Sequence, residues 1–129
     1  MSNYFGTGLD QAPLNEQLGE AAYWDLKQLY DVMFKAPVTV SSAYTARNWE
    51  TVRVDTRSSS VTVTLPANPQ VNDRIQFADA FGTWHINRPM INRNGKKIMG
   101  LDQDLELNLK GENFTLAYSG DTDGWVILG

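Results

Sequence analysis

The sequence predicts a mainly β fold: an antiparallel β-sandwich or a small jelly-roll-like barrel over residues 37–129, preceded by one amphipathic helix and a flexible arm within residues 1–36. Three observations lead to this prediction. Short runs of alternating apolar and polar residues begin after residue 38, turn-forming residues separate these runs, and helically spaced apolar residues precede Pro37. A period of two is typical of half-buried strands, and steps of three and four are typical of a helix face.

The first twelve residues, MSNYFGTGLDQA, follow no period. Gly6 and Gly8 favour flexibility, while Tyr4, Phe5 and Leu9 offer apolar surface that a partner can cover. From these residues alone, two interpretations stay open: a docking arm, or a frayed terminus without a role.

Residues 14–34 indicate a helix. Their apolar side chains recur at steps of three and four, at Leu14, Leu18, Ala22, Leu26, Leu29 and Met33. Pro13 suits a first helical position, and Pro37 ends the segment. Gly19 weakens the first half, so the helix is best supported over residues 21–34. A helix of this length is marginal alone in water and gains from burial in an oligomer.

Seven or eight short strands are expected after residue 38. Their inward-facing residues are Val52 and Val54; Val61, Val63 and Leu65; Ile75 and Phe77; Leu105, Leu107 and Leu109; and Phe114, Leu116 and Tyr118. Asn94-Gly95, between residues 90–92 and 97–99, predicts a hairpin, because a type I′ turn needs positive φ at both central residues. Such regularly spaced strands favour an antiparallel sandwich or small barrel.

Composition narrows the classes of function. The chain has no cysteine, which excludes disulfide scaffolds and thiolate metal sites. Its net charge of -4 argues against binding a phosphate backbone, which needs a dense cationic face. No apolar stretch approaches the roughly 20 residues of a membrane helix, and the N-terminus lacks a signal-peptide pattern. We therefore expect neither nucleic acid nor membrane as a partner.

Residues suited to catalysis are sparse. His85 is the only histidine, and a general base needs an oriented partner, so an exposed histidine is the simpler interpretation. Asp102, Asp104 and Glu106 have the spacing of one strand face and offer oxygen ligands for a hard cation. Because leucines alternate with them, a solvated outer face explains the same pattern. We expect no enzymatic activity, no cofactor and no metal.

The segment GTWHINRP, residues 82–89, is the candidate recognition loop. Trp84, with His85, Asn87 and Arg88 beside it, would suit a sugar ring or a protein partner if its indole were exposed. The alternative is that Trp84 packs beneath a long loop, and the sequence favours that interpretation at least as well.

Residues 54–128 resemble a β-module of tailed-bacteriophage virion proteins, which include tail fibres, tailspikes and particle-surface proteins. The resemblance rests on VDT (54–56), VTVTLPANP (61–69), NDRIQFAD (72–79), INRNGKKIMG (91–100), DLELNL (104–109) and FTLAYSGDTDGWVIL (114–128). GLDQAPLNEQLGEAAY (8–23) resembles the leader that attaches such proteins to the virion. Asn72-Asp73 replaces the usual Gly-Asp, and residues 82–89 are less typical, so a specific ligand would be encoded there.

The resemblance implies a non-enzymatic virion structural protein that is assembled in the host cytoplasm. Homotrimers are usual in the family, and the partners would be other virion proteins of the tail or capsid. The chain would be an accessory tail component, such as a short fibre or adaptor, or a head-surface decoration protein. Its attachment segment would use Tyr4, Phe5, Leu9, Leu14 and Leu18.

Two other functions compete with this one. The first is a host-glycan-binding adhesin that uses the loop around Trp84. The second is a polysaccharide hydrolase, which would need a cleft with an acid-base pair that the sequence does not indicate.

Overall fold

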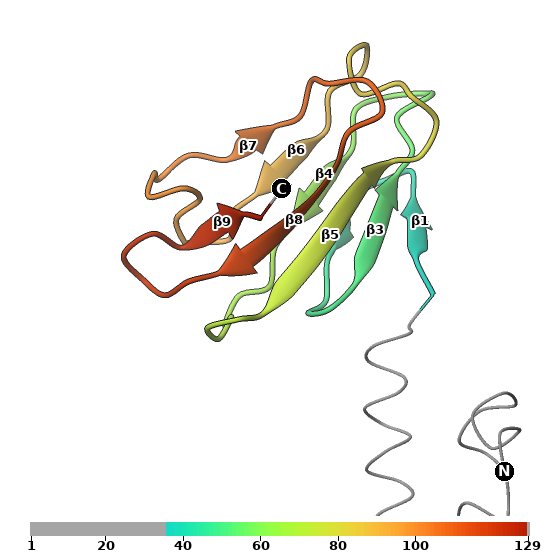
Figure 1. Ribbon diagram of the computed structural model, residues 1–129. Helices are drawn as coiled ribbons and strands as arrows, with labels where there is room; N and C mark the ends of the chain where they lie inside the picture. The colour runs from blue at the N-terminus through green and yellow to red at the C-terminus, as the bar shows by residue number, and fades with distance from the viewer. Residues whose placement is uncertain (1–35, 129) are drawn as a thin grey trace, which may run out of the picture. The chain divides into compact units, whose positions relative to one another are not determined.

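The computed structural model describes residues 36–128, and the chain divides into two compact units between Ala36 and Pro37. The arm and helix predicted in the first unit, with Tyr4, Phe5, Leu9, Leu14 and Leu18, lie outside the described residues. The second unit, which we call the β-unit, is built from two sheets (Figure 1). Between residues 36 and 128 no helix is long and apolar enough to cross a membrane.

The described part of the β-unit contains nine strands. They are β1 (Val38–Val40), β2 (Tyr44–Thr45), β3 (Thr51–Val54), β4 (Thr62–Thr64), β5 (Arg74–Asp79), β6 (Met90–Asn92), β7 (Leu105–Glu106), β8 (Asn113–Tyr118) and β9 (Trp125–Ile127). A five-stranded sheet has the order β1-β3-β5-β8-β9, and a four-stranded sheet has the order β2-β4-β6-β7. The prediction of a mainly β fold is confirmed.

The first six strands alternate between the two sheets and pair in parallel. β1 pairs with β3 and β3 with β5 in one sheet, while β2 pairs with β4 and β4 with β6 in the other. Parallel neighbours need a crossover between them, and here a strand of the opposite sheet supplies each crossover. The chain therefore winds as a coil between the sheets. The predicted all-antiparallel pairing is wrong for this half, because alternation specifies which face a residue occupies and not the direction of its neighbour.

The last three strands each pair antiparallel to a neighbouring strand. β7 lies antiparallel to β6, β8 antiparallel to β5, and β9 antiparallel to β8. The predicted antiparallel pairing is correct only for this part of the chain. Both sheets are consequently mixed.

The core lies between the inner faces of the two sheets. Val52, Phe77 and Phe114 form one row across the five-stranded sheet, and the two phenylalanine rings stack with centroids 5.4 Å apart. Val63 and Ile91 form the matching row of the four-stranded sheet. Full burial of such a side chain stabilises a fold by about 1.5–3 kcal/mol. The predicted inward-facing residues are buried, except that Leu105 is partly buried and Leu109 is exposed.

The Asn94-Gly95 turn forms, but the predicted hairpin does not. Asn94 and Gly95 have φ values of 50° and 86°, and a backbone hydrogen bond of 3.2 Å closes the turn. β6 nevertheless pairs with β7, while Ile98 forms isolated bridges with Leu101 and with Trp125 of β9. Ile98 is buried in the core, so its packing decides where the chain goes after the turn.

Candidate functional site

Trp84 anchors the predicted recognition loop to the core. Its side chain is fully buried, its Nε1 donates a hydrogen bond of 3.2 Å to the carbonyl of Val54, and its ring meets Phe114 edge-on at 6.5 Å. The interpretation of Trp84 as an exposed recognition aromatic is therefore wrong. A buried indole needs a partner for its N–H, and the end of β3 supplies it.

The other three residues of this loop that were predicted to contact a ligand have different surroundings from one another. Asn87 Nδ2 donates to the carbonyl of Thr56 at 2.9 Å, and Arg88 Nη1 pairs with Glu106 Oε1 at 3.1 Å. His85 is exposed. None of these residues lines the hollow described below.

Asp79 organises the same loop, and sequence reasoning missed it. Its Oδ1 accepts hydrogen bonds from the backbone N–H groups of Gly82 and Thr83 at 2.9 and 3.1 Å. Its Oδ2 accepts from those of Trp84 and Gly111 at 3.3 and 2.9 Å. Burial raises the pKa of Asp79, but the four N–H donors favour the charged form and bring the pKa below its ordinary value.

We expect Asp79→Asn to lower the free energy of unfolding by about 2–4 kcal/mol, because one amide oxygen cannot serve four donors. The folded-state pKa is lowered, so the stabilisation is complete above the ordinary carboxyl pKa of about 3.9 and is lost as pH falls through the folded value. Urea unfolding of the full chain from neutral to acidic pH measures both effects.

Asp102→Asn is the matched control for this prediction. Its carboxylate is exposed and pairs with Arg93 at 3.3 Å, so its loss should change stability by less than about 1 kcal/mol. Equal losses for the two variants, or an unchanged acid dependence for Asp79→Asn, would contradict the prediction.

The acidic residues at 102–106 interact with arginines. Asp102 Oδ1 pairs with Arg93 Nη1, Asp104 Oδ1 accepts from the backbone N–H of Arg93 at 2.9 Å, and Glu106 pairs with Arg88. Among residues 36–128, no group of three or more His, Cys, Asp or Glu side chains is placed to hold a metal ion.

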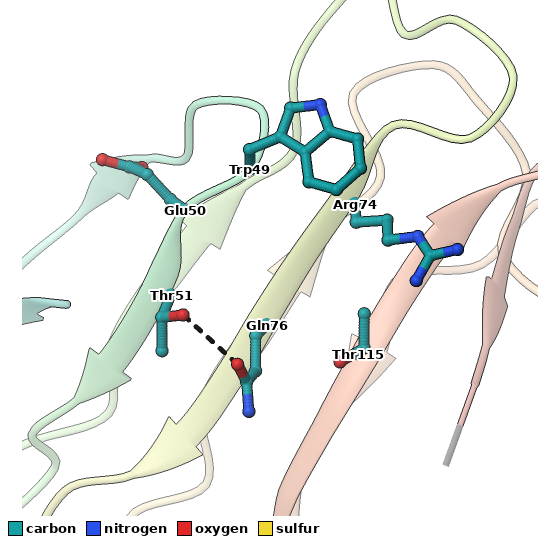
Figure 2. A pocket seen from close by; sticks show the side chains of 6 residues that line it. All are labelled: Trp49, Glu50, Thr51, Arg74, Gln76 and Thr115. Carbon is teal, nitrogen blue, oxygen red and sulfur yellow. Dashed lines mark hydrogen bonds between the residues drawn. The ribbon is translucent and has the colours of Figure 1, made fainter. Parts of the chain in front are cut away.

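A hollow of about 180 Å³ opens on the outer face of the five-stranded sheet (Figure 2). We call it the Trp49 hollow. Its lining residues are Trp49, Glu50, Thr51, Arg74, Gln76 and Thr115. Thr51 of β3, Gln76 of β5 and Thr115 of β8 are direct cross-strand neighbours, so they form one outward row. No sequence pattern joins these positions, because only strand pairing brings them together.

Trp49 and Arg74 form the upper wall of the hollow in Figure 2. The guanidinium carbon of Arg74 lies 5.9 Å from the centroid of the Trp49 ring. The backbone N–H of Trp49 donates to the carbonyl of Arg74 at 2.7 Å, and the backbone N–H of Arg74 donates to Asn48 Oδ1 at 3.1 Å. The turn before β3 is thereby fixed to the start of β5.

The carboxylate of Glu50 points away from the hollow (Figure 2). It accepts the hydroxyl of Tyr44 at 2.7 and 2.9 Å and the backbone N–H of Arg47 at 2.7 Å. Burial raises the pKa of Tyr44, and the hydrogen bond to Glu50 raises it further. With this carboxylate turned inward, the charge that faces the hollow is the cation of Arg74.

The Trp49 hollow therefore offers an aromatic surface, one guanidinium group, and a row of hydroxyl and amide groups. This combination suits the binding of a small polar molecule. No family model matches the sequence, and no curated protein matches it.

Proposed function

We propose that the chain is a non-enzymatic structural protein of a tailed-bacteriophage particle. It acts as a homotrimeric accessory component of the tail, such as a short fibre or adaptor, or as a head-surface decoration protein. Its N-terminal segment attaches it to other virion proteins. The resemblance of residues 54–128 to virion β-modules supports the particle setting.

One structural observation supports a role in assembly. The large apolar side chains Met99, Leu101, Ile127 and Leu128 are exposed around β9, the edge strand of the five-stranded sheet. Met99 and Ile127 are in contact, because the Ile127 N–H lies 3.3 Å from Met99 Sδ. The backbone of Trp125 in β9 is already paired with Lys97 and Met99, so the exposed apolar side chains are the feature that favours association. This surface suits contact with another copy or with a neighbouring virion protein.

Two acidic side chains of the β-unit, Asp79 and Asp121, hold its loops in place. Asp79 binds four backbone N–H groups, and Asp121 accepts the hydroxyl of Tyr118 at 2.5 Å. The Asp121 hydrogen bond, with a smaller contribution from burial, raises the pKa of Tyr118 to about 12. These hydrogen-bonded carboxylates support the interpretation of the β-unit as a rigid scaffold.

We expect deletion of residues 1–12 to leave the β-unit folded and to abolish incorporation into phage particles, because the docking side chains Tyr4, Phe5 and Leu9 are removed. Immunoblotting of purified particles measures incorporation, and far-UV circular dichroism measures folding. Joint substitution of those three residues by alanine should have the same effect, whereas Thr7→Ala with Gln11→Ala should not. Normal incorporation of the truncated chain would refute the attachment role, and a native mass other than three chains would refute the trimer.

The alternative function is a host-glycan-binding adhesin. Trp84 is buried, so the loop at residues 82–89 offers no exposed tryptophan to a glycan. Trp49 is exposed and lies beside the polar row of the Trp49 hollow. This hollow is therefore the surface that best suits glycan binding.

A further inference from the structure

Trp49 has an unusual backbone conformation for an exposed tryptophan. Its φ is 67°, in the left-handed region that bulky residues rarely adopt, and 46% of its surface is exposed. Glycine or asparagine would adopt this conformation with less strain. Local strain that the surrounding structure maintains is typical of binding sites. This backbone conformation places the indole of Trp49 at the rim of the Trp49 hollow.

Arg74 brings a positive charge to the same hollow. Three other arginines of the β-unit pair with carboxylates: Arg57 with Asp55, Arg88 with Glu106 and Arg93 with Asp102. Within residues 36–128, no carboxylate lies within ion-pair distance of the Arg74 guanidinium, which instead faces the Trp49 ring. A guanidinium group presents several N–H donors in a planar arrangement that matches a carboxylate. Arg74 is therefore available to an anionic ligand.

The polar row beneath these residues is held in place by hydrogen bonds. Thr51 Oγ1 donates to Gln76 Oε1 at 3.2 Å, and Gln76 Nε2 donates to Asn113 Oδ1 at 2.8 Å. These bonds fix the orientation of the Gln76 amide, and its second N–H can still donate a hydrogen bond to a ligand. Thr51 keeps lone pairs on its hydroxyl oxygen, and the Thr115 side chain lines the same hollow. Sugar hydroxyl groups are well matched to such a mixture of donors and acceptors.

We propose that the Trp49 hollow binds a saccharide unit that carries a carboxylate. The apolar face of the sugar ring packs on the indole of Trp49, and the carboxylate pairs with the guanidinium of Arg74. The hydroxyl groups of the ring bind Thr51, Gln76 and Thr115. The site would bind this ligand whether or not the chain belongs to a phage particle.

Other classes of ligand would leave some of these groups of the hollow without a partner. A purely apolar ligand would cover Arg74 and Gln76 without satisfying their hydrogen-bonding groups. A nucleic acid would need several phosphate contacts, whereas the hollow has one arginine in a chain of net charge -4. A neutral sugar would leave Arg74 without a counter-charge. An acidic sugar uses the aromatic, cationic and polar groups together.

Glucuronate and glucose are suitable probes, because they differ mainly in one carboxylate. In a titration of the full chain followed by NMR, we expect glucuronate to shift the Trp49 indole N–H signal saturably, with a dissociation constant on the order of 1 mM. We expect glucose to bind about tenfold more weakly, since it lacks the pair with Arg74. Trp49→Phe assigns the indole signal among those of the four tryptophans.

Two variants separate the contributions of the two side chains. Arg74→Gln should remove the preference for glucuronate over glucose, and Trp49→Ala should remove binding of both sugars. The matched control is Arg53→Gln, because Arg53 is an exposed arginine of β3 on the same outer face and lies outside the hollow. The Arg53 variant should bind glucuronate as the unaltered chain does. Circular dichroism confirms that each variant is folded.

Several outcomes would overturn the proposal. These are an absence of saturable shifts with glucuronate, equal affinity for glucose and glucuronate, or an unchanged preference in folded Arg74→Gln. Acetate and inorganic phosphate test for a simple anion site, and shifts of equal size and affinity with either would exclude recognition of the sugar ring. Loss of glucuronate binding in Arg53→Gln would show that general surface charge is responsible.

Discussion

Replacing Gly124 by alanine should lower the free energy of unfolding of the β-unit by more than about 3 kcal/mol, a large loss for the addition of one methyl group. A Cβ atom at this position would overlap the carbonyl oxygen of Lys97 and would lie 2.5 Å from its carbonyl carbon. Both are backbone atoms. They cannot retreat easily, because the Lys97 carbonyl accepts the N–H of Trp125 at 2.8 Å beside the bridge from Ile98.

Gly95→Ala is the control that measures the cost of a positive φ alone, without a contact like that between Gly124 and Lys97. Gly95 also has a positive φ, 86°, but a Cβ atom there would meet nothing within 4 Å. Its substitution should therefore carry only the left-handed conformational penalty, about 1–2 kcal/mol. Urea unfolding of the full chain, followed by far-UV circular dichroism, measures both variants. Similar losses of stability at the two positions would mean that the contact with Lys97 is not limiting.

The second large effect is expected at Trp84. Trp84→Ala should lower the free energy of unfolding by about 3–5 kcal/mol, the usual range for removing a large buried aromatic side chain. The substitution leaves a cavity beside Phe114 and removes the hydrogen bond to the Val54 carbonyl. The same unfolding measurement gives the loss. Trp84→Phe keeps much of the ring and removes only the indole N–H. Because the Val54 carbonyl still accepts the N–H of Ala80 at 3.2 Å, this lost hydrogen bond should account for about 0.5–1.5 kcal/mol.

Ile86→Ala is the control for this prediction. Ile86 belongs to the same loop but exposes 66% of its surface, so its truncation should change stability by less than about 0.5 kcal/mol. If Trp84→Ala were as mild as Ile86→Ala, the loop would not depend on its buried indole. A ligand role for Trp84 would then have to be reconsidered.

The positions of the strands followed from local patterns. Alternation placed Val52 and Val54, and likewise Ile75 and Phe77, on the buried face, and these side chains are buried. The turn at Asn94-Gly95 was also correct, because positive φ is a property of those two residues. Leu109 was assigned to the interior by the same alternation and is exposed, because the chain turns there and the Leu109 carbonyl accepts the N–H of Glu112 at 3.3 Å.

The candidate sites were much less predictable. Asp79 had no sequence signal, because its four partners are backbone N–H groups whose positions depend on two loops. The Trp49 hollow joins residues of three strands that are neighbours only after β3, β5 and β8 pair. Trp84 was ambiguous, because its neighbours in sequence are polar while its neighbours in space are Val54 and Phe114.

By itself, then, the sequence determined a β-rich unit after Pro37, the buried face of most strands, and the chemistry of the Asn94-Gly95 turn. Each depends on interactions within a few residues, which alternation and backbone preference record. Only the tertiary structure decided that β1 to β6 wind in parallel between two sheets, that Trp84 is buried, and that Trp49 faces a polar hollow. These features depend on which distant strands become neighbours, and the packing of the whole core selects that pairing.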